Sequence, residues 1–262
     1  MKVGVIGAGV MGEALITALI SYGVNAKEIT ISEKRTDRAD ELVSRYGISV
    51  EELSKNVSSS EILLLVVKPQ DMDGVLAEIR ADLKITTTLV SFAAGKKIDF
   101  ICARLGYAPV IRVMPNTPTL VGAGMAAISV GTGVSSTHKD FVAGFLAATG
   151  KVVEVNEELQ DAVTATSGSG PAYFFAFVEA MIEGAMALGL SKEVATELTV
   201  QTFVGSAKLL QESGKSATTL RENVTSPNGT TAAALASFSA HNLSNLVSQA
   251  MESARNRSIE LA

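Results

Sequence analysis

The sequence predicts an α/β fold with a mostly parallel sheet, followed by an all-helical domain. Up to about Asn156, short aliphatic runs alternate with helix-length segments, joined by short connections that carry Gly or Pro. Beyond that point the strand-like runs stop, and Ala-rich helical patterns fill the rest of the chain. We therefore expect two domains, residues 1–156 and residues 157–262.

Seven strands are expected in the first domain. The aliphatic run Ile62–Val67 is unbroken, as is typical of a strand covered by helices on both faces. Helices are expected at Glu13–Tyr22 and at Thr36–Arg45, each after one of the first two strands. The expected strands are Val3–Ile6, Glu28–Ser32, Ile62–Val67, Thr88–Ser91, Pro109–Met114, Met125–Val130 and Val152–Val155.

In the second domain, two long helices have recognisable ends. Ser169-Gly170-Pro171 begins the first, with Pro in the first turn, where its missing N–H costs nothing. Gly189 ends it in a left-handed cap, and Ser191 caps the start of the second. That second helix runs to about Ser213, with Gly214 as its stop.

The helix from Pro171 to Leu188 is apolar around most of its circumference, which predicts burial on most sides. We expect an interleaved homodimer to cover it; the alternative is packing against the strands and helices of its own protomer. Its large apolar residues are Phe174, Phe175, Phe177, Val178, Met181, Ile182, Met186 and Leu188.

Composition excludes several classes of protein. Of the 262 residues 47% are hydrophobic, which excludes a disordered chain, and the net charge of −5 without a basic cluster argues against nucleic acid as a partner. Cys102 is the one cysteine, and no Cys/His cluster has metal spacing, so we expect neither a disulfide nor a metal and favour the cytoplasm. No membrane association is expected, because every stretch of spanning length contains a charge.

A glycine-rich loop, Gly7-Ala8-Gly9-Val10-Met11-Gly12, follows the first strand and opens the first helix. In a Rossmann fold, such glycines permit a tight turn, close approach of a pyrophosphate, and close packing of helix on strand. The context is correct for dinucleotide binding, and we expect Gly7, Gly9, Val10, Met11 and Gly12 to contact the cofactor. The alternative is a glycine-rich turn without a ligand.

Ser32-Glu33-Lys34-Arg35, at the end of the second strand, contains opposing signals for the choice of cofactor. An acidic residue such as Glu33 commonly binds the ribose 2′-hydroxyl of NAD, whereas Lys34 and Arg35 suit the 2′-phosphate of NADP. We expect NADPH, with NADH also accepted. The alternative for the two bases is a solvated start of the next helix.

Two further segments follow strands whose carboxyl ends should meet at the ligand-binding edge of the sheet. They are Val67-Lys68-Pro69-Gln70 and Met114-Pro115-Asn116-Thr117-Pro118. Either could be an ordinary turn, but their shared position favours contact with the cofactor.

The segment Val224–Thr231 precedes an Ala-rich helix starting near Ala232. A helix start presents free backbone N–H groups, which suit a carboxylate, and Thr231 adds a hydroxyl donor. The alternative is an ordinary Ser/Thr helix cap.

These motifs, together with Ser167-Gly168-Ser169-Gly170-Pro171-Ala172-Tyr173, resemble in order and spacing the hallmarks of pyrroline-5-carboxylate reductase over essentially the whole chain. The resemblance implies a Rossmann domain followed by an all-helical dimerisation domain, with dimers that often assemble into decamers. It also implies reduction of 1-pyrroline-5-carboxylate to L-proline by NAD(P)H, the last step of proline biosynthesis.

By the same resemblance, Lys68, Pro69 and the segment Met114–Thr117 lie beside the nicotinamide and its ribose. Substrate-binding residues, donated by the partner subunit around the carboxylate and ring nitrogen, are Ser226, Gly229, Thr230 and Thr231. Glu212 matches the family's substrate-side glutamate after a one-residue gap. The chain departs from the family at three positions. Leu53 stands in the register of a cofactor-contacting Asn, with Asn56 three residues later. Asn228 stands where many members have Gly, and Ser239 replaces the polar or charged residue that usually closes the last motif.

No acid–base dyad is evident, and a protonated imine is electrophilic enough not to require one. We assign Thr231 as the catalytic residue, hydrogen-bonded to the ring nitrogen. The two histidines, His138 and His241, lie outside the motifs and are expected to be structural or exposed. Glu179 and Glu183 are expected to form a solvated or interface-edge stripe.

Two rivals remain. A β-hydroxyacid or 6-phosphogluconate-type dehydrogenase would use a lysine in the helix that joins the domains, but the helix Pro171–Leu188 contains neither Lys nor Arg. A non-catalytic NADPH sensor would keep the glycine loop, but it would have little use for the anion-binding segment Thr225–Thr231.

Overall fold

The computed structural model describes residues 1–261 and forms two compact units. The first comprises Met1–Ser169 together with residues 254–261, and the second is Gly170–Ser253. The division between them falls at Ser169–Gly170, later in the chain than the expected boundary after residue 156.

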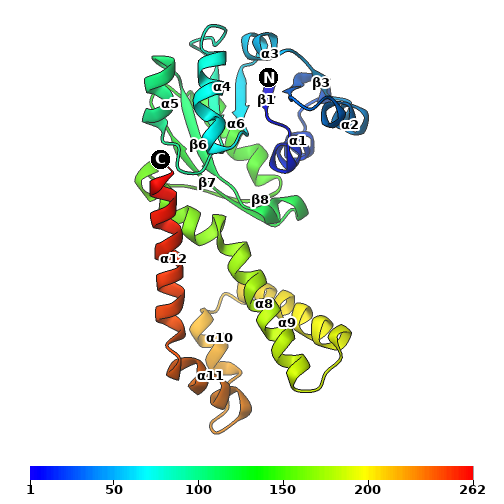
Figure 1. Cartoon of the computed structure of the whole chain (residues 1–262), viewed down its shortest axis with the longest axis vertical. Helices are drawn as coiled ribbons and strands as arrows, with labels where there is room; N and C mark the ends of the chain where they lie inside the picture. The colour runs from blue at the N-terminus through cyan, green and yellow to red at the C-terminus, as the bar shows by residue number, and fades with distance from the viewer. Residues whose placement is uncertain (262) are drawn as a thin grey trace. The chain divides into compact units, whose positions relative to one another are not determined.

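One eight-stranded sheet forms the centre of the first unit, with the order β3-β2-β1-β4-β5-β6-β7-β8 (Figure 1). All neighbours pair in parallel except β6 and β7, so the prediction of a mostly parallel sheet is confirmed. The strands are β1 (Val3–Ile6), β2 (Ile29–Ser32), β3 (Ser49–Val50), β4 (Ile62–Leu65), β5 (Thr88–Ser91), β6 (Val110–Met114), β7 (Gly124–Val130) and β8 (Gly150–Glu154).

Helices cover both faces of this sheet. Its α-helices are α1 (Val10–Tyr22), α2 (Thr36–Tyr46), α3 (Leu53–Ser59), α4 (Met72–Ile79), α5 (Ile98–Leu105), α6 (Ser136–Ala147) and α7 (Gln160–Val163). One buried core joins α1, α2 and α6 to the sheet, with Leu15, Leu42 and Phe145 fully buried in it. A second core joins α3, α4 and α5 to the opposite face. The central strands β1, β4 and β5 are therefore buried along their whole length, and β4 is continuously aliphatic.

Three local features differ from the sequence-based expectation. Glu28 ends a short 3-10 helix, Ala26–Glu28, and is not part of β2. The edge strand β3 was missed because two residues are too few to show a period, although Thr30 pairs with Ser49 in register. A π-helical turn, Thr164–Gly168, directly precedes the helix expected to start at Ser169-Gly170-Pro171.

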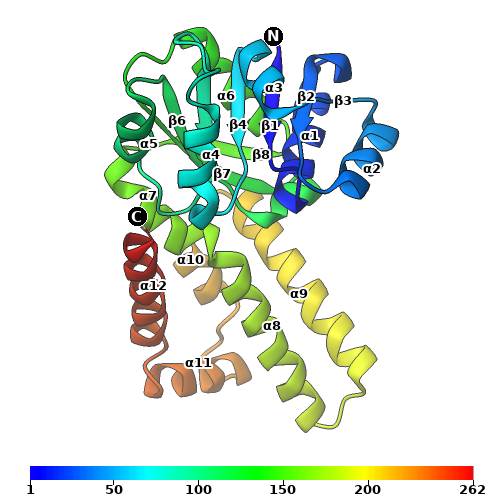
Figure 2. The same ribbon diagram turned by 45° about the horizontal axis from the view of Figure 1, so that its top comes forward.

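The second unit is entirely helical, as predicted. Its helices are α8 (Gly170–Ala187), α9 (Lys192–Glu212), α10 (Ala217–Asn223), α11 (Thr230–Ala240) and most of α12 (Leu243–Glu260). Figure 2 shows α8 and α9 side by side, joined by the tight turn at Gly189. Gly189 has the expected left-handed conformation, with φ of 101°, and the Ser191 side chain accepts a hydrogen bond from the Val194 N–H.

Helix α8 exposes its apolar surface in the single chain. None of its residues is buried, and Phe175 is 57% exposed. Contiguous apolar surface of this kind marks an interaction site in a folded protein. Among residues 1–261, no helix is both long and apolar enough to span a membrane.

Candidate functional site: a dinucleotide cavity and an open helix start

The glycine loop after β1 has no room for side chains at two of its positions. Gly7 has φ of 88°, and a Cβ there would lie 2.7 Å from the carbonyl oxygen of Val66. A Cβ on Gly12 would overlap the carbonyl oxygen of Gly7. The loop therefore passes close to the carboxyl end of β4 and turns directly into α1.

Gly9 leaves the start of α1 open. It is the N-cap of α1, and no side chain caps the helix there. A Cβ on Gly9 would have no protein atom within 4 Å, so the glycine leaves open space in front of the helix N-terminus. Free backbone N–H groups and the positive end of a helix dipole at an open surface suit a pyrophosphate.

A cavity of about 840 Å³ lies in front of this helix start. The expected cofactor residues that line it are Gly7, Gly9, Glu33, Lys34, Val67 and Lys68. Five other expected cofactor residues are near these in the chain but do not line the cavity: Val10, Met11, Gly12, Arg35 and Pro69. Its size and its glycine-lined opening onto the helix start fit a nicotinamide dinucleotide.

The Glu33 side chain is hydrogen-bonded to the glycine loop. Its Oε2 accepts a hydrogen bond from the Ala8 N–H at 2.8 Å, and its Oε1 accepts one from the Arg35 N–H at 3.0 Å. The carboxylate is thereby fixed between the end of β2 and the loop.

An ion-pair network behind the loop was not foreseen from the sequence. Arg38 donates through Nε to the carbonyl oxygen of Ala8 at 3.1 Å and pairs with Glu13 and Glu41. The hydrogen bond from Arg38 holds the pKa of Glu13 below its ordinary value. Arg45 also pairs with both glutamates. The signal for this network in the sequence was the presence of oppositely charged residues in the first turns of α1 and α2.

The segment after β6 has a structural role in its own right. Asn116 caps a short 3-10 helix, and its Oδ1 accepts a hydrogen bond from the Met125 N–H at 2.8 Å. Met114 ends β6, and its side chain lies against Gly168. Met114, Pro115 and Asn116 thus stand at the carboxyl end of a strand, as predicted, but they do not line the cavity.

Leu53 and Asn56 occupy different environments. Leu53 lines the cavity, whereas Asn56 is fully buried and donates through Nδ2 to Ser32 Oγ at 2.9 Å. Ser32 itself lines the cavity. Asn56 therefore holds the end of β2 in position from the buried interior.

In the second unit, Gly229 caps α11 without any side-chain hydrogen bond. Its N–H donates to the Ser226 carbonyl oxygen at 3.1 Å, and a Cβ at Gly229 would displace the Ser226 hydroxyl from its present position. Asn228 has φ of 57°, a left-handed conformation that Asn tolerates better than most residues other than Gly. Thr230 and Thr231 follow in the first turn, the former exposed and the latter half-buried.

Three further titratable side chains were singled out from the sequence. Glu212 ends α9 with an exposed side chain, 4.0 Å from Lys208. His138 Nδ1 lies 2.7 Å from Thr88 Oγ1, and His241 Nδ1 lies 2.9 Å from the carbonyl oxygen of Ser237 in its own helix. Both histidines make local structural contacts.

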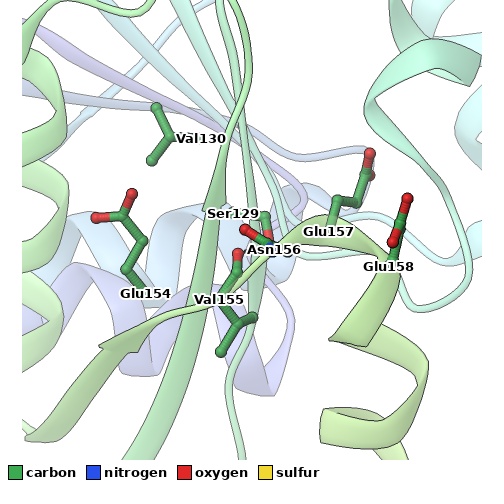
Figure 3. A pocket seen from close by; sticks show the side chains of 7 residues that line it. All are labelled: Ser129, Val130, Glu154, Val155, Asn156, Glu157 and Glu158. Atoms are coloured by element: carbon green, nitrogen blue, oxygen red, sulfur yellow. Dashed lines mark hydrogen bonds between the residues drawn. The ribbon is translucent and has the colours of Figure 1, made fainter.

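A second cavity, of about 430 Å³, lies beside β7 and the end of β8 (Figure 3). Figure 3 shows Glu154 on one side of the ribbon and Glu157 and Glu158 on the turn that follows. Its three carboxylates suit neither a pyrophosphate nor a carboxylate ligand. In residues 1–261 no cluster of His, Cys, Asp and Glu could hold a metal ion.

The first strand of the mostly parallel sheet passes through a glycine loop into an open helix start, beside a cavity. This arrangement is typical of the dinucleotide-binding domain of NAD(P)-dependent oxidoreductases. Residues 157–261 match the family described as pyrroline-5-carboxylate reductase dimerisation, and residues 2–95 match that described as NADP oxidoreductase, coenzyme F420-dependent. Pyrroline-5-carboxylate reductase of Pseudomonas aeruginosa is 40% identical over 264 residues, covering 100% of this chain and 97% of that protein.

Solved structures agree with this classification. A pyrroline-5-carboxylate reductase from Coxiella burnetii superposes with a TM-score of 0.93 at 33% identity, covering 100% of this chain and 98% of the other. The Plasmodium falciparum pyrroline carboxylate reductase with NADP bound has a TM-score of 0.88 at 28% identity, with the same coverage. The chain belongs to the pyrroline-5-carboxylate reductase family.

Proposed function

We infer that this protein reduces 1-pyrroline-5-carboxylate to L-proline with NAD(P)H, the last step of proline biosynthesis. The observation that carries this conclusion is the open N-terminus of α1 at Gly9, in front of a cavity large enough for the dinucleotide. Membership of the reductase family supplies the substrate.

When bound, the nicotinamide supplies a hydride to the imine carbon. The glycine loop and the N-terminus of α1 bind the pyrophosphate, and Glu33, Lys34 and Arg35 surround the adenosine ribose. Val67, Lys68 and Pro69 flank the nicotinamide ribose, together with Met114, Pro115 and Asn116.

The substrate carboxylate binds at the start of α11. No side chain caps α11 at Gly229, so an anion can complete the hydrogen bonding of the backbone N–H groups in its first turn. Ser226, Gly229 and Thr230 surround the carboxylate, and this segment comes from the partner subunit. Glu212 contributes from the end of α9 on the substrate side.

Thr231 hydrogen-bonds to the ring nitrogen and is the catalytic residue. An imine that arrives protonated accepts the hydride without a further acid, and the product is a secondary amine. The threonine hydroxyl is too weak an acid to supply the proton itself, so its contribution is orientation.

Residues 1–156 form the cofactor domain and residues 157–262 the dimerisation and substrate domain in this proposal. The chain self-associates through the helical domain, whose exposed apolar helix α8 a second copy covers. We propose that dimers assemble further into decamers, that the protein is cytoplasmic, and that it binds neither nucleic acid nor membranes. Sedimentation analysis of wild type and Phe175→Asp tests the assembly: we expect the variant to dissociate, and an unchanged mass would exclude α8 from the interface.

The decisive assay follows oxidation of NADPH and NADH with pyrroline-5-carboxylate in wild type, Thr231→Ala and Thr196→Ala. Thr196 is the control, because its hydroxyl bonds only the Lys192 carbonyl oxygen of its own helix. We expect Thr231→Ala to lose at least about tenfold in kcat/KM, since a hydrogen bond to a charged group contributes roughly 1.5–3 kcal/mol. If Thr231→Ala leaves turnover unchanged, the proposed reductase activity stands but the proposed substrate site is wrong.

Absence of turnover with either cofactor, in folded and oligomeric protein, would favour the non-catalytic sensor. Titration of proline into the cofactor-bound protein separates these two functions. A reductase binds proline more tightly with cofactor present, whereas a sensor shows no coupling.

A further inference from the structure

We propose that this reductase prefers NADH to NADPH, and that the carboxylate of Glu33 sets the preference. The inference rests on the proposed dinucleotide site and goes beyond it. It reverses the preference for NADPH expected from Lys34 and Arg35 in the sequence, because the hydrogen bonds and charges around Glu33 favour NADH.

The position and orientation of Glu33 are fixed by the backbone. Both carboxylate oxygens accept N–H donors, from Ala8 at 2.8 Å and from Arg35 at 3.0 Å, so the side chain is tied to the glycine loop. Each oxygen keeps a lone pair for a further donor. A carboxylate at the end of the second strand of a Rossmann sheet accepts from the ribose 2′-hydroxyl of NAD, and it repels a phosphate at that position.

The arginine closest to the loop is not free to bind a phosphate. Arg38 is occupied by the Ala8 carbonyl oxygen, Glu13 and Glu41, and its side chain is 11% exposed. Arg45 pairs with the same two glutamates. To bind a 2′-phosphate, Arg38 would have to give up its ion pairs with Glu13 and Glu41 and its hydrogen bond to Ala8.

The charges that line the cavity are mostly negative. The basic lining residues are Lys34 and Lys68, and Arg35 borders the cavity. The acidic lining residues are Glu33, Asp40, Glu51, Glu52, Asp71 and Glu78. Within residues 1–261, only Glu51 of these six forms an ion pair with a lysine, Lys55, at 2.7 Å. NADPH brings about 1.5 to 2 more negative charges than NADH into this field.

Direct binding tests the proposal without the imine. NADH and NADPH are titrated by calorimetry into full-length wild type, Glu33→Gln and Glu28→Gln at constant ionic strength. Gln keeps an oxygen acceptor for the Ala8 N–H but removes the charge. Glu28, in the short 3-10 helix before β2 and outside the cavity lining, is the matched control.

We expect wild type to bind NADH about tenfold more tightly than NADPH, because a like charge beside the 2′-phosphate opposes its binding. Glu33→Gln should lower that ratio by about tenfold, mainly through tighter NADPH binding, while Glu28→Gln leaves it unchanged. High salt should narrow the wild-type ratio, a measurement that requires no variant.

If wild type binds NADPH as tightly as NADH or more tightly, the proposal is overturned, and Lys34 and Arg35 become the residues that bind the 2′-phosphate. An unchanged ratio in Glu33→Gln would also overturn it. If neither dinucleotide binds, the proposed function fails with it. If NADH binds preferentially but pyrroline-5-carboxylate is not reduced, the substrate assignment fails and the cofactor preference stands.

Discussion

Ser258 donates a hydrogen bond from Oγ to Asp161 Oδ1 at 2.7 Å, although the two residues are 97 positions apart in the chain. Ser258 is 2% exposed, and Asp161 also lies 3.6 Å from the buried Arg112. The end of α12 is therefore held against α7 and β6 by a buried polar network within the first unit.

Ser258→Ala should lower the stability of the first unit by about 1–2 kcal/mol, because a buried acceptor on Asp161 loses its donor. Thermal unfolding at fixed protein and cofactor concentration measures this, since assembly makes the midpoint concentration-dependent. Ser253→Ala is the matched control: its hydroxyl bonds the Gln249 carbonyl oxygen on the exposed part of the same helix, and its loss should have little effect. Equal effects from the two variants would show that the contact with Asp161 contributes nothing.

Arg112 lies in β6 with a 3% exposed side chain, between Glu157 at 3.4 Å and Asp161 at 3.6 Å. Arg112→Met should cost about 3–5 kcal/mol of unfolding free energy, because it leaves carboxylates partly buried without their cation. Arg104→Met removes a 38% exposed arginine paired with Asp73, and it should cost about 1 kcal/mol or less. Urea unfolding of both variants tests this ordering, and a reversed ordering would contradict it.

Glu13 provides a test of the ion pairs behind the glycine loop. Its pKa is held below its ordinary value of 4.5, chiefly by the hydrogen bond from Arg38. The Glu13 carboxylate thus binds a proton less readily in the folded chain than in the unfolded chain. The stabilisation is full above pH 4.5, the pKa in the unfolded chain, and is lost as the pH falls through the lower pKa of the folded chain. The difference in melting temperature between wild type and Glu13→Gln should shrink as pH falls below 4.5. A difference that stays constant through that range would mean that the ion pair does not stabilise the fold.

Most strands were predicted to within a residue or two because burial on both faces requires unbroken aliphatic runs, as in Leu63 to Leu65. The two-residue strand β3 and the π-helical turn were missed, since neither is long enough to impose a period. Arg112, within the apolar run of β6, was an overlooked signal: a charged residue in a buried strand requires a partner carboxylate.

At the site, the sequence predicted the glycine loop and the end of β2, and Gly7, Gly9, Glu33 and Lys34 line one cavity, but the pairing of the charges there was not predicted. Gly7 and Gly9 could be identified from spacing alone, because the chemistry of a tight turn and a phosphate contact requires glycine. The pairing of Arg38 with Glu13 depends on a contact between residues 25 positions apart, which no local pattern encodes. That pairing decides which cations remain for the cofactor.

Gly9→Ala separates ligand binding from folding. A Cβ at Gly9 meets no protein atom within 4 Å, and the φ of −67° is ordinary for alanine, so the variant should fold with nearly unchanged stability. The methyl group would project into the space in front of the α1 N-terminus, where the pyrophosphate must approach the backbone closely. We expect the dissociation constant for NADH to rise at least about tenfold, as lost backbone contacts to an anion imply. Gly74→Ala is the control, because Gly74 lies in α4 with equally open surroundings; it should leave NADH binding intact and stabilise the helix slightly. Unchanged NADH binding in Gly9→Ala would mean that the pyrophosphate does not contact this loop.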